Sequence, residues 1–129
     1  LRYAAQDASA RQIAQWFFGR PEIEAVLHPA LPDSPGHAHW QRSCTQAAGL
    51  FSVVFKAHHS FAGVDRFIDA LTLFKIGYSW AGPTSLVVPY DLSGIRSTPK
   101  WSGPLVRFSV GLEGTEDLIA DIDQALKAL

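Results

Sequence analysis

Arg107 is the residue of this sequence with the most specific chemistry. It lies in the run Leu105–Val110, where strand alternation sends three apolar side chains to one side and Arg107 and Ser109 to the other. A guanidinium presents a rigid fork of N–H donors that matches a carboxylate through two parallel hydrogen bonds. Arg107 is therefore a candidate anion receptor on an open sheet face. The alternative is an arginine that is merely solvated.

The segment Tyr78–Pro83 combines two large aromatic side chains with a serine, a glycine and a proline. It follows a predicted helix and precedes a predicted strand. One interpretation is a packed turn, because aromatic side chains usually bury themselves. The other is the wall of a binding pocket, in which backbone donors and the Ser79 hydroxyl face a ligand.

The histidines form two local pairs, His37 with His39 and His58 with His59. Neither pair is accompanied by Asp, Glu or Cys at a spacing typical of metal ligands. We therefore predict solvated loop histidines and no metal site.

Two further reactive segments carry weaker signals. Cys44 has no neighbouring helix start or basic cluster to activate it, which predicts a buried, inert thiol. The run Ser97–Lys100 resembles a cofactor-bearing lysine loop, but Pro99 and the loop composition argue against that interpretation. No glycine-rich phosphate loop or paired-carboxylate arrangement is present.

Three amphipathic helices are predicted from apolar residues at helical spacing. The first stops before Gly19 and Pro21, the second has Gly77 just beyond its end, and the third opens with Thr115 as a candidate cap. Their apolar stripes are Ala10, Ile13, Ala14 and Phe17; Val64, Phe67, Ile68 and Leu71; and Ile122, Ala125, Leu126 and Leu129.

Short apolar runs predict the strands, which lie at Ile23–Leu27, Leu50–Phe55, Leu86–Pro89 and Leu105–Val110. The two late strands are joined by a loop, Asp91–Pro104, without a helix between them. This order predicts one α+β domain over residues 1–129, with a mostly antiparallel sheet that carries the helices on one face. The other face needs a partner or water.

Composition excludes several classes of protein. Eleven basic and twelve acidic residues give a formal charge of −1, so neither nucleic acid nor an anionic membrane surface is an expected partner. No apolar run approaches the roughly 20 residues of a spanning helix. With a single cysteine, no internal disulfide can form, which favours a cytoplasmic protein.

Because the chain begins at Leu1 and contains no methionine, we expect it to be a piece of a longer protein.

Several separated blocks of the sequence resemble one known family. They are Val26–Pro32, Ser34–His37 with Trp40, Gly49–Ser52, Gly77–Trp80, Ser85–Leu86, Leu105–Arg107 and Val110–Asp121. In order and spacing these blocks are similar to the C-terminal domain of bacterial cystathionine β-lyases. Those enzymes belong to the transsulfuration group of pyridoxal-phosphate enzymes, whose fold is that of aspartate aminotransferase (fold type I). The resemblance spans essentially all of the chain.

This resemblance implies a fold, a reaction and a site. The chain would be the small domain that follows a large cofactor domain, in a tetramer that cleaves cystathionine to homocysteine, pyruvate and ammonia. Arg107 would bind the substrate α-carboxylate, with Ser79 and Trp80 beside it. The residues that bind pyridoxal 5′-phosphate, including the Schiff-base lysine, would belong to the large domain. No catalytic or cofactor-binding residue is therefore expected in this chain, and the isolated chain is expected to be inactive.

Some positions depart from the family pattern. The paired glycines and glutamate before Ser85 are replaced by Ala81, Gly82, Pro83 and Thr84, and Ser43, Cys44 and Gln46 also differ. Substrate preference therefore stays open between the β-lyases and the sister γ-lyases and γ-synthases, although Tyr78 and Trp80 favour the former. A free-standing α+β domain that binds an amino acid or mediates dimerisation is the alternative from a different class.

Overall fold

A five-stranded sheet forms the centre of the protein in the computed structural model, which describes residues 1–129. The strand order is β1-β2-β5-β4-β3, and every neighbouring pair is antiparallel except the parallel pair of β3 and β4. The elements are α1 (Arg2–Phe17), β1 (Ile23–Leu27), α2 (His37–Ser43), β2 (Leu50–Phe55), α3 (Phe61–Asp69), β3 (Lys75–Ile76), β4 (Leu86–Tyr90), η1 (Leu92–Gly94), β5 (Leu105–Ser109), α4 (Thr115–Ala125) and η2 (Leu126–Ala128).

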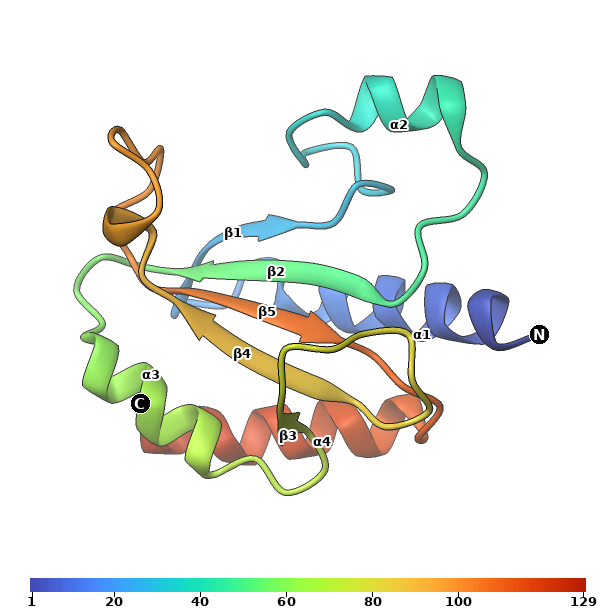
Figure 1. The fold of residues 1–129 in the computed structure, drawn as a ribbon. Coiled ribbons are helices and arrows are strands. Elements are labelled where there is room, and N and C mark those ends of the chain that lie inside the picture. The colour runs from blue at the N-terminus through green and yellow to red at the C-terminus, as the bar shows by residue number, and fades with distance from the viewer.

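Helices α1, α3 and α4 supply the apolar residues that cover one face of this sheet. In Figure 1, α1 and α4 lie behind the strands, and the open face of the sheet is turned toward the viewer. Their buried stripes pack against Phe51, Val106 and Phe108 in one hydrophobic cluster. The predicted fold class, α+β with a mostly antiparallel sheet and its helices on one face, is confirmed.

Four local predictions are wrong. The second helix ends at Asp69, well before Gly77, because the chain turns there toward β3. Gly114 is the N-cap residue of α4, so Thr115 is its first helical residue, and its hydroxyl donates to Ser9 Oγ. Cys44 is exposed rather than buried, since it follows α2 at the surface. The fourth is the predicted loop at His37 and His39, which is instead helix α2; this helix has no buried residue, so its sequence shows no apolar stripe.

Asp121 joins α4 to the segment between α3 and β3. It is 4% exposed, and its carboxylate accepts hydrogen bonds from the amides of Thr72, Leu73 and Phe74 and from the Thr72 hydroxyl. Burial alone would raise the pKa of Asp121, but these four donors outweigh it and lower the pKa. The carboxylate thus joins α4 to the segment between α3 and β3 through charge-assisted hydrogen bonds, an arrangement called here the Asp121 clamp.

His28 is a buried polar residue that the sequence analysis did not single out. Its Nδ1 accepts a hydrogen bond from the Ala30 amide at 3.2 Å, whereas Nε2 is buried without a partner. Burial, and to a lesser extent the nearby charge of Arg11, lowers the pKa of His28 and favours the neutral ring.

None of the helices combines the length and hydropathy needed to cross a lipid bilayer.

Candidate functional site

Arg107 lies on the open face of the sheet, as predicted. It is in β5, between β2 and β4, where it pairs with Ser52 and Val88. Its neighbours Val106 and Phe108 are fully buried on the helical side, whereas Arg107 is only half-buried. The alternation of the strand therefore points this guanidinium away from the hydrophobic core.

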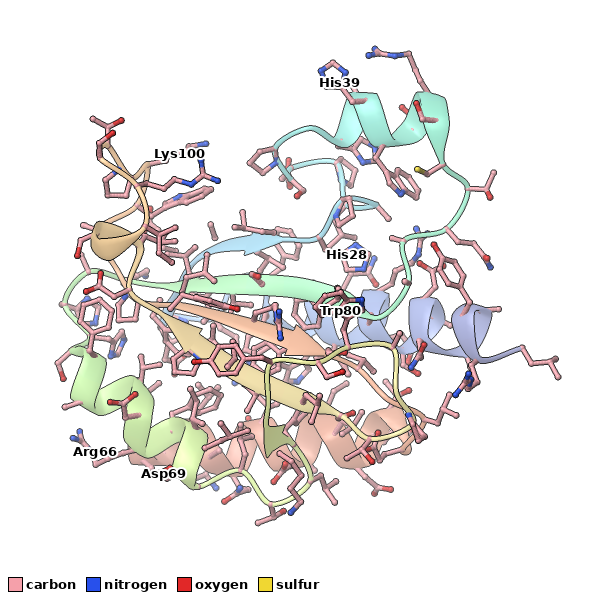
Figure 2. All side chains as sticks on the ribbon, viewed as in Figure 1. His28, His39, Arg66, Asp69, Trp80 and Lys100 are labelled. Atoms are coloured by element: carbon pink, nitrogen blue, oxygen red, sulfur yellow. The ribbon has the colours of Figure 1, made fainter.

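The structure brings Arg107 together with the turn that sequence reasoning had singled out separately. Its Nη2 donates to the carbonyl oxygen of Tyr78 at 2.8 Å, and more weakly to those of Ser79 at 3.3 Å and Gly77 at 3.4 Å. The ring of Trp80 lies 5.9 Å from the Arg107 Cζ, within the range of a cation–π contact. Figure 2 shows Trp80 in front of the open sheet face.

Arg107 keeps unused donors and an uncompensated charge. Of its three nitrogens only Nη2 makes hydrogen bonds, and Nε is buried without a partner. The salt bridges of the chain join Arg11 to Asp7 and Arg20 to Asp123, so no carboxylate neutralises Arg107. Carbonyl oxygens orient a guanidinium but carry no net charge. A half-buried cation in this condition is suited to bind an anion with two acceptor atoms.

The turn itself is exposed. Tyr78 is 70% and Trp80 59% exposed, and Ser79 is exposed as well, so the packed-turn interpretation is wrong. Two backbone carbonyls of this turn, with that of the preceding Gly77, accept hydrogen bonds from Arg107, while the side chains of Tyr78, Ser79 and Trp80 are exposed.

Tyr90 is a site residue that the sequence analysis missed. Its ring lies 6.0 Å from the Arg107 Cζ. Tyr90 is the last residue of β4, whereas the turn precedes that strand. Strand alternation could have found it, because Tyr90 shares a face with Val88, the residue paired with Arg107. The cation is therefore flanked by one aromatic ring from the turn and one from β4.

The site is open on this chain. None of the surface depressions is lined by Arg107, Ser79 or Trp80. One depression of about 400 Å³ lies instead around Trp101, Lys100 and Leu27, near the ends of β1 and β5. An enclosed pocket at Arg107 would need a further wall from outside this chain.

The other candidate residues do not join the site. His37 Nδ1 is 2.8 Å from the Pro29 carbonyl oxygen, and the Lys100 ammonium lies 4.9 Å from the centre of the Trp101 ring. The rings of His58 and His59 contact each other just after β2; His58 is exposed, whereas His59 is half-buried with its Nε2 covered, so the prediction of a solvated histidine is wrong for His59. No group of three or more His, Cys, Asp or Glu side chains is arranged to hold a metal ion.

Ala81 adopts a strained backbone conformation within the turn. Its φ is +62°, in the left-handed region that favours glycine. We predict that Ala81→Gly raises the free energy of unfolding by about 0.5 kcal/mol, because relief of the Cβ clash exceeds the added entropy of the unfolded chain. Urea denaturation would measure this.

A matched control is Ala57→Gly, at an exposed position outside the left-handed region, which should destabilise the chain. Ala48, with a φ of +57°, should behave like Ala81. If Ala81→Gly destabilises as much as Ala57→Gly, the turn is not strained at Ala81.

Together these features define a class: a small α+β domain whose open sheet face presents an unpaired arginine beside an aromatic turn. The model of one family, described as Cys/Met metabolism PLP-dependent enzyme, matches residues 1–127. The chain belongs to this family.

Similar proteins agree with this assignment. The chain is 39% identical over 127 residues to a cystathionine β-lyase of Salmonella typhimurium, covering 95% of this chain and 32% of that protein. Among solved structures, it is similar to an O-acetylhomoserine sulfhydrylase of Wolinella succinogenes (TM-score 0.82, 31% identity, 97% of this chain and 34% of that one). It is also similar to a cystathionine γ-synthase of Xanthomonas oryzae pv. oryzae in complex with cystathionine (TM-score 0.85, 27% identity, 98% of this chain and 34% of that one). The chain spans about a third of the length of these relatives.

Proposed function

We propose that residues 1–129 form the small, C-terminal domain of a pyridoxal-phosphate-dependent carbon–sulfur lyase that cleaves cystathionine at its β carbon. The observation that carries this proposal is the half-buried Arg107, which has free donors and no carboxylate partner, in a chain of this family. Membership of the family favours this function over a free-standing amino-acid-binding or dimerisation domain.

In this proposal Arg107 binds the substrate α-carboxylate. The carbonyls of Gly77, Tyr78 and Ser79 hold Nη2 and so fix the plane of the guanidinium. The unused donors then point in a defined direction before substrate arrives, which reduces the entropy lost on binding. The Ser79 hydroxyl and the Trp80 backbone amide would supply further donors to the same carboxylate.

The cofactor would lie outside this chain. The groups that contact Arg107 are carbonyls and aromatic rings, with no amine to which an aldehyde could attach. In line with the family resemblance, we assign pyridoxal 5′-phosphate to the large domain of the parent protein, where it would supply an electron sink for negative charge at the substrate Cα. The same proposal includes a cytoplasmic homotetramer and an isolated chain without lyase activity.

The choice of the β carbon rests on Tyr78 and Trp80, which resemble the β-lyase branch, because overall sequence identity hardly separates the two branches. The β-lyase of Salmonella typhimurium is 39% identical, compared with 37% for a cystathionine γ-lyase of Bos taurus, and the γ-synthase is 27% identical with a TM-score of 0.85. Since both kinds of enzyme share this domain, its fold alone does not select the bond that is cleaved.

Product analysis tests the proposed reaction. The complete parent enzyme, supplied with pyridoxal 5′-phosphate and cystathionine, should release pyruvate and homocysteine in equal amounts. Cleavage at the γ carbon would release cysteine instead and would assign the enzyme to the sister branch. If neither set of products forms, cystathionine is not the substrate.

A further inference from the structure

The turn that contacts Arg107 needs support from outside itself. The loop Gly77–Thr84 connects β3 to β4, and most of its side chains are exposed. Such a loop buries little apolar surface and would sample many conformations unless polar contacts restrain it. Its hydrogen bonds to the rest of the chain therefore decide whether the site is preformed.

Apart from the hydrogen bonds of Arg107, the strongest of these contacts lie at the C-terminal end of the loop. Both oxygens of the Glu113 carboxylate bind Ser85: one accepts from the Ser85 amide at 2.7 Å and the other from the Ser85 hydroxyl at 2.7 Å. Ser85 is fully buried, and its Oγ accepts in turn from the Gly111 amide at 2.8 Å. Hydrogen bonds to an ionised carboxylate are stronger than those between neutral groups.

The segment that holds Ser85 is also the continuation of the strand that carries Arg107. Gly111 and Glu113 lie two and four residues beyond the end of β5, and the Leu112 amide donates to the Pro83 carbonyl at 2.8 Å. A Cβ on Gly111 would clash with the Pro83 carbonyl oxygen and with a Glu113 carboxylate oxygen, so the two segments are in direct contact. The arginine and the loop thus share one anchor.

A second contact restrains the middle of the loop. The Gln6 side chain, 3% exposed in α1, donates to the Gly82 carbonyl at 2.8 Å. This amide is neutral and makes one hydrogen bond to the loop, whereas Glu113 makes two charge-assisted ones. Apart from Arg107 itself, Glu113 is therefore the principal side-chain restraint on this loop.

We propose that Glu113 is a positioning residue for substrate binding: through Ser85 it fixes the loop Gly77–Thr84 relative to Arg107. The inference rests on the proposed function, because it assumes that this loop and Arg107 bind the substrate carboxylate. Glu113 itself does not contact Arg107, so its effect would be transmitted by the loop backbone.

Hydrogen exchange of the complete enzyme tests the first half of this inference without reference to activity. In Glu113→Ala, the hydrogen-bonded amides at the two ends of the loop and on its anchor, those of Gly77, Ser85, Gly111 and Leu112, should exchange about tenfold faster, since the Ser85 amide loses its charged acceptor. Exchange in β2 should stay unchanged. Unchanged exchange in the loop, or equal acceleration in β2, would overturn the positioning role.

Steady-state kinetics with cystathionine tests the second half. Glu113→Ala should raise KM about tenfold and change kcat by less than about threefold, the pattern of lost substrate binding rather than lost chemistry. Glu113→Gln keeps one acceptor oxygen and should give an intermediate KM, which also covers the case in which the alanine variant does not fold. The matched control is Glu116→Ala, an exposed acid in the first turn of α4 without a hydrogen bond or salt bridge, which should alter neither measurement.

The two measurements separate the possible failures. Faster loop exchange with an unchanged KM would show that Glu113 restrains the loop but that the loop does not bind substrate, which would overturn both the positioning role and the proposed site. Unchanged loop exchange combined with a strong effect of Arg107 substitution on KM would overturn the role of Glu113 alone.

Discussion

Substituting Arg107 by alanine in the complete enzyme should lower kcat/KM for cystathionine about 300-fold, because a charge-assisted, two-point hydrogen bond to the substrate carboxylate is lost. Arg107→Lys keeps the charge but not the fork of donors, so we expect an intermediate loss of about 30-fold. The absorbance of the bound cofactor should not change in either variant, since Arg107 is assigned to the substrate and not to the cofactor. Steady-state kinetics and an absorbance spectrum provide both measurements.

The matched control for this experiment is Arg96→Ala. Arg96 is an exposed arginine on the loop between β4 and β5, and its side chain makes no hydrogen bond or salt bridge. Its removal should leave kcat/KM within about twofold. Added guanidinium ion should restore part of the lost activity of Arg107→Ala. It should not change the activity of the Arg96→Ala control. Kinetics that are unchanged in Arg107→Ala would remove Arg107 from the site.

Substituting Asp121 by alanine should lower the free energy of unfolding by about 3 kcal/mol, because three backbone amides and the Thr72 hydroxyl lose their acceptor in a largely buried position. Asp121→Asn retains one acceptor oxygen and should cost about half as much. Chemical denaturation followed by far-UV circular dichroism would measure both values. Asp123→Ala, which removes an exposed ion pair with Arg20, should cost less than about 1 kcal/mol. Equal losses in the Asp121 and Asp123 variants would contradict the clamp.

Asp121 should also make stability dependent on pH. Its pKa is lower in the folded protein than the ordinary value near 3.8, so the unfolded chain binds the proton more tightly. The stabilisation is therefore present above pH 3.8 and is lost as pH falls through the lowered pKa of the folded state. The pKa of Asp91 is also lowered, chiefly by the Ser93 hydroxyl, so the difference between the wild type and Asp121→Asn isolates the Asp121 contribution. An identical pH dependence in the two proteins would contradict this assignment.

Local periodicity predicted most of the fold. The stripe Ala10, Ile13, Ala14 and Phe17 is fully buried, as a repeat of 3.6 residues requires of a helix on a hydrophobic layer. Elements without a buried face gave no such signal. β3 has two exposed residues and α2 has none that is buried, so neither shows a period that could be recognised.

The amino-acid pattern by itself determined the amphipathic helices, the core strands and the direction of Arg107, because these depend on side-chain repeats within single elements. Only the tertiary structure decided what Arg107 meets. Its contacts with the Gly77–Ser79 carbonyls span 28 to 30 residues, and the contact of Glu113 with Ser85 spans 28. Such contacts follow from the strand order, in which β5 lies beside β4 and β4 beside β3. No local pattern encodes that order, since it arises from the burial of all the apolar faces at once.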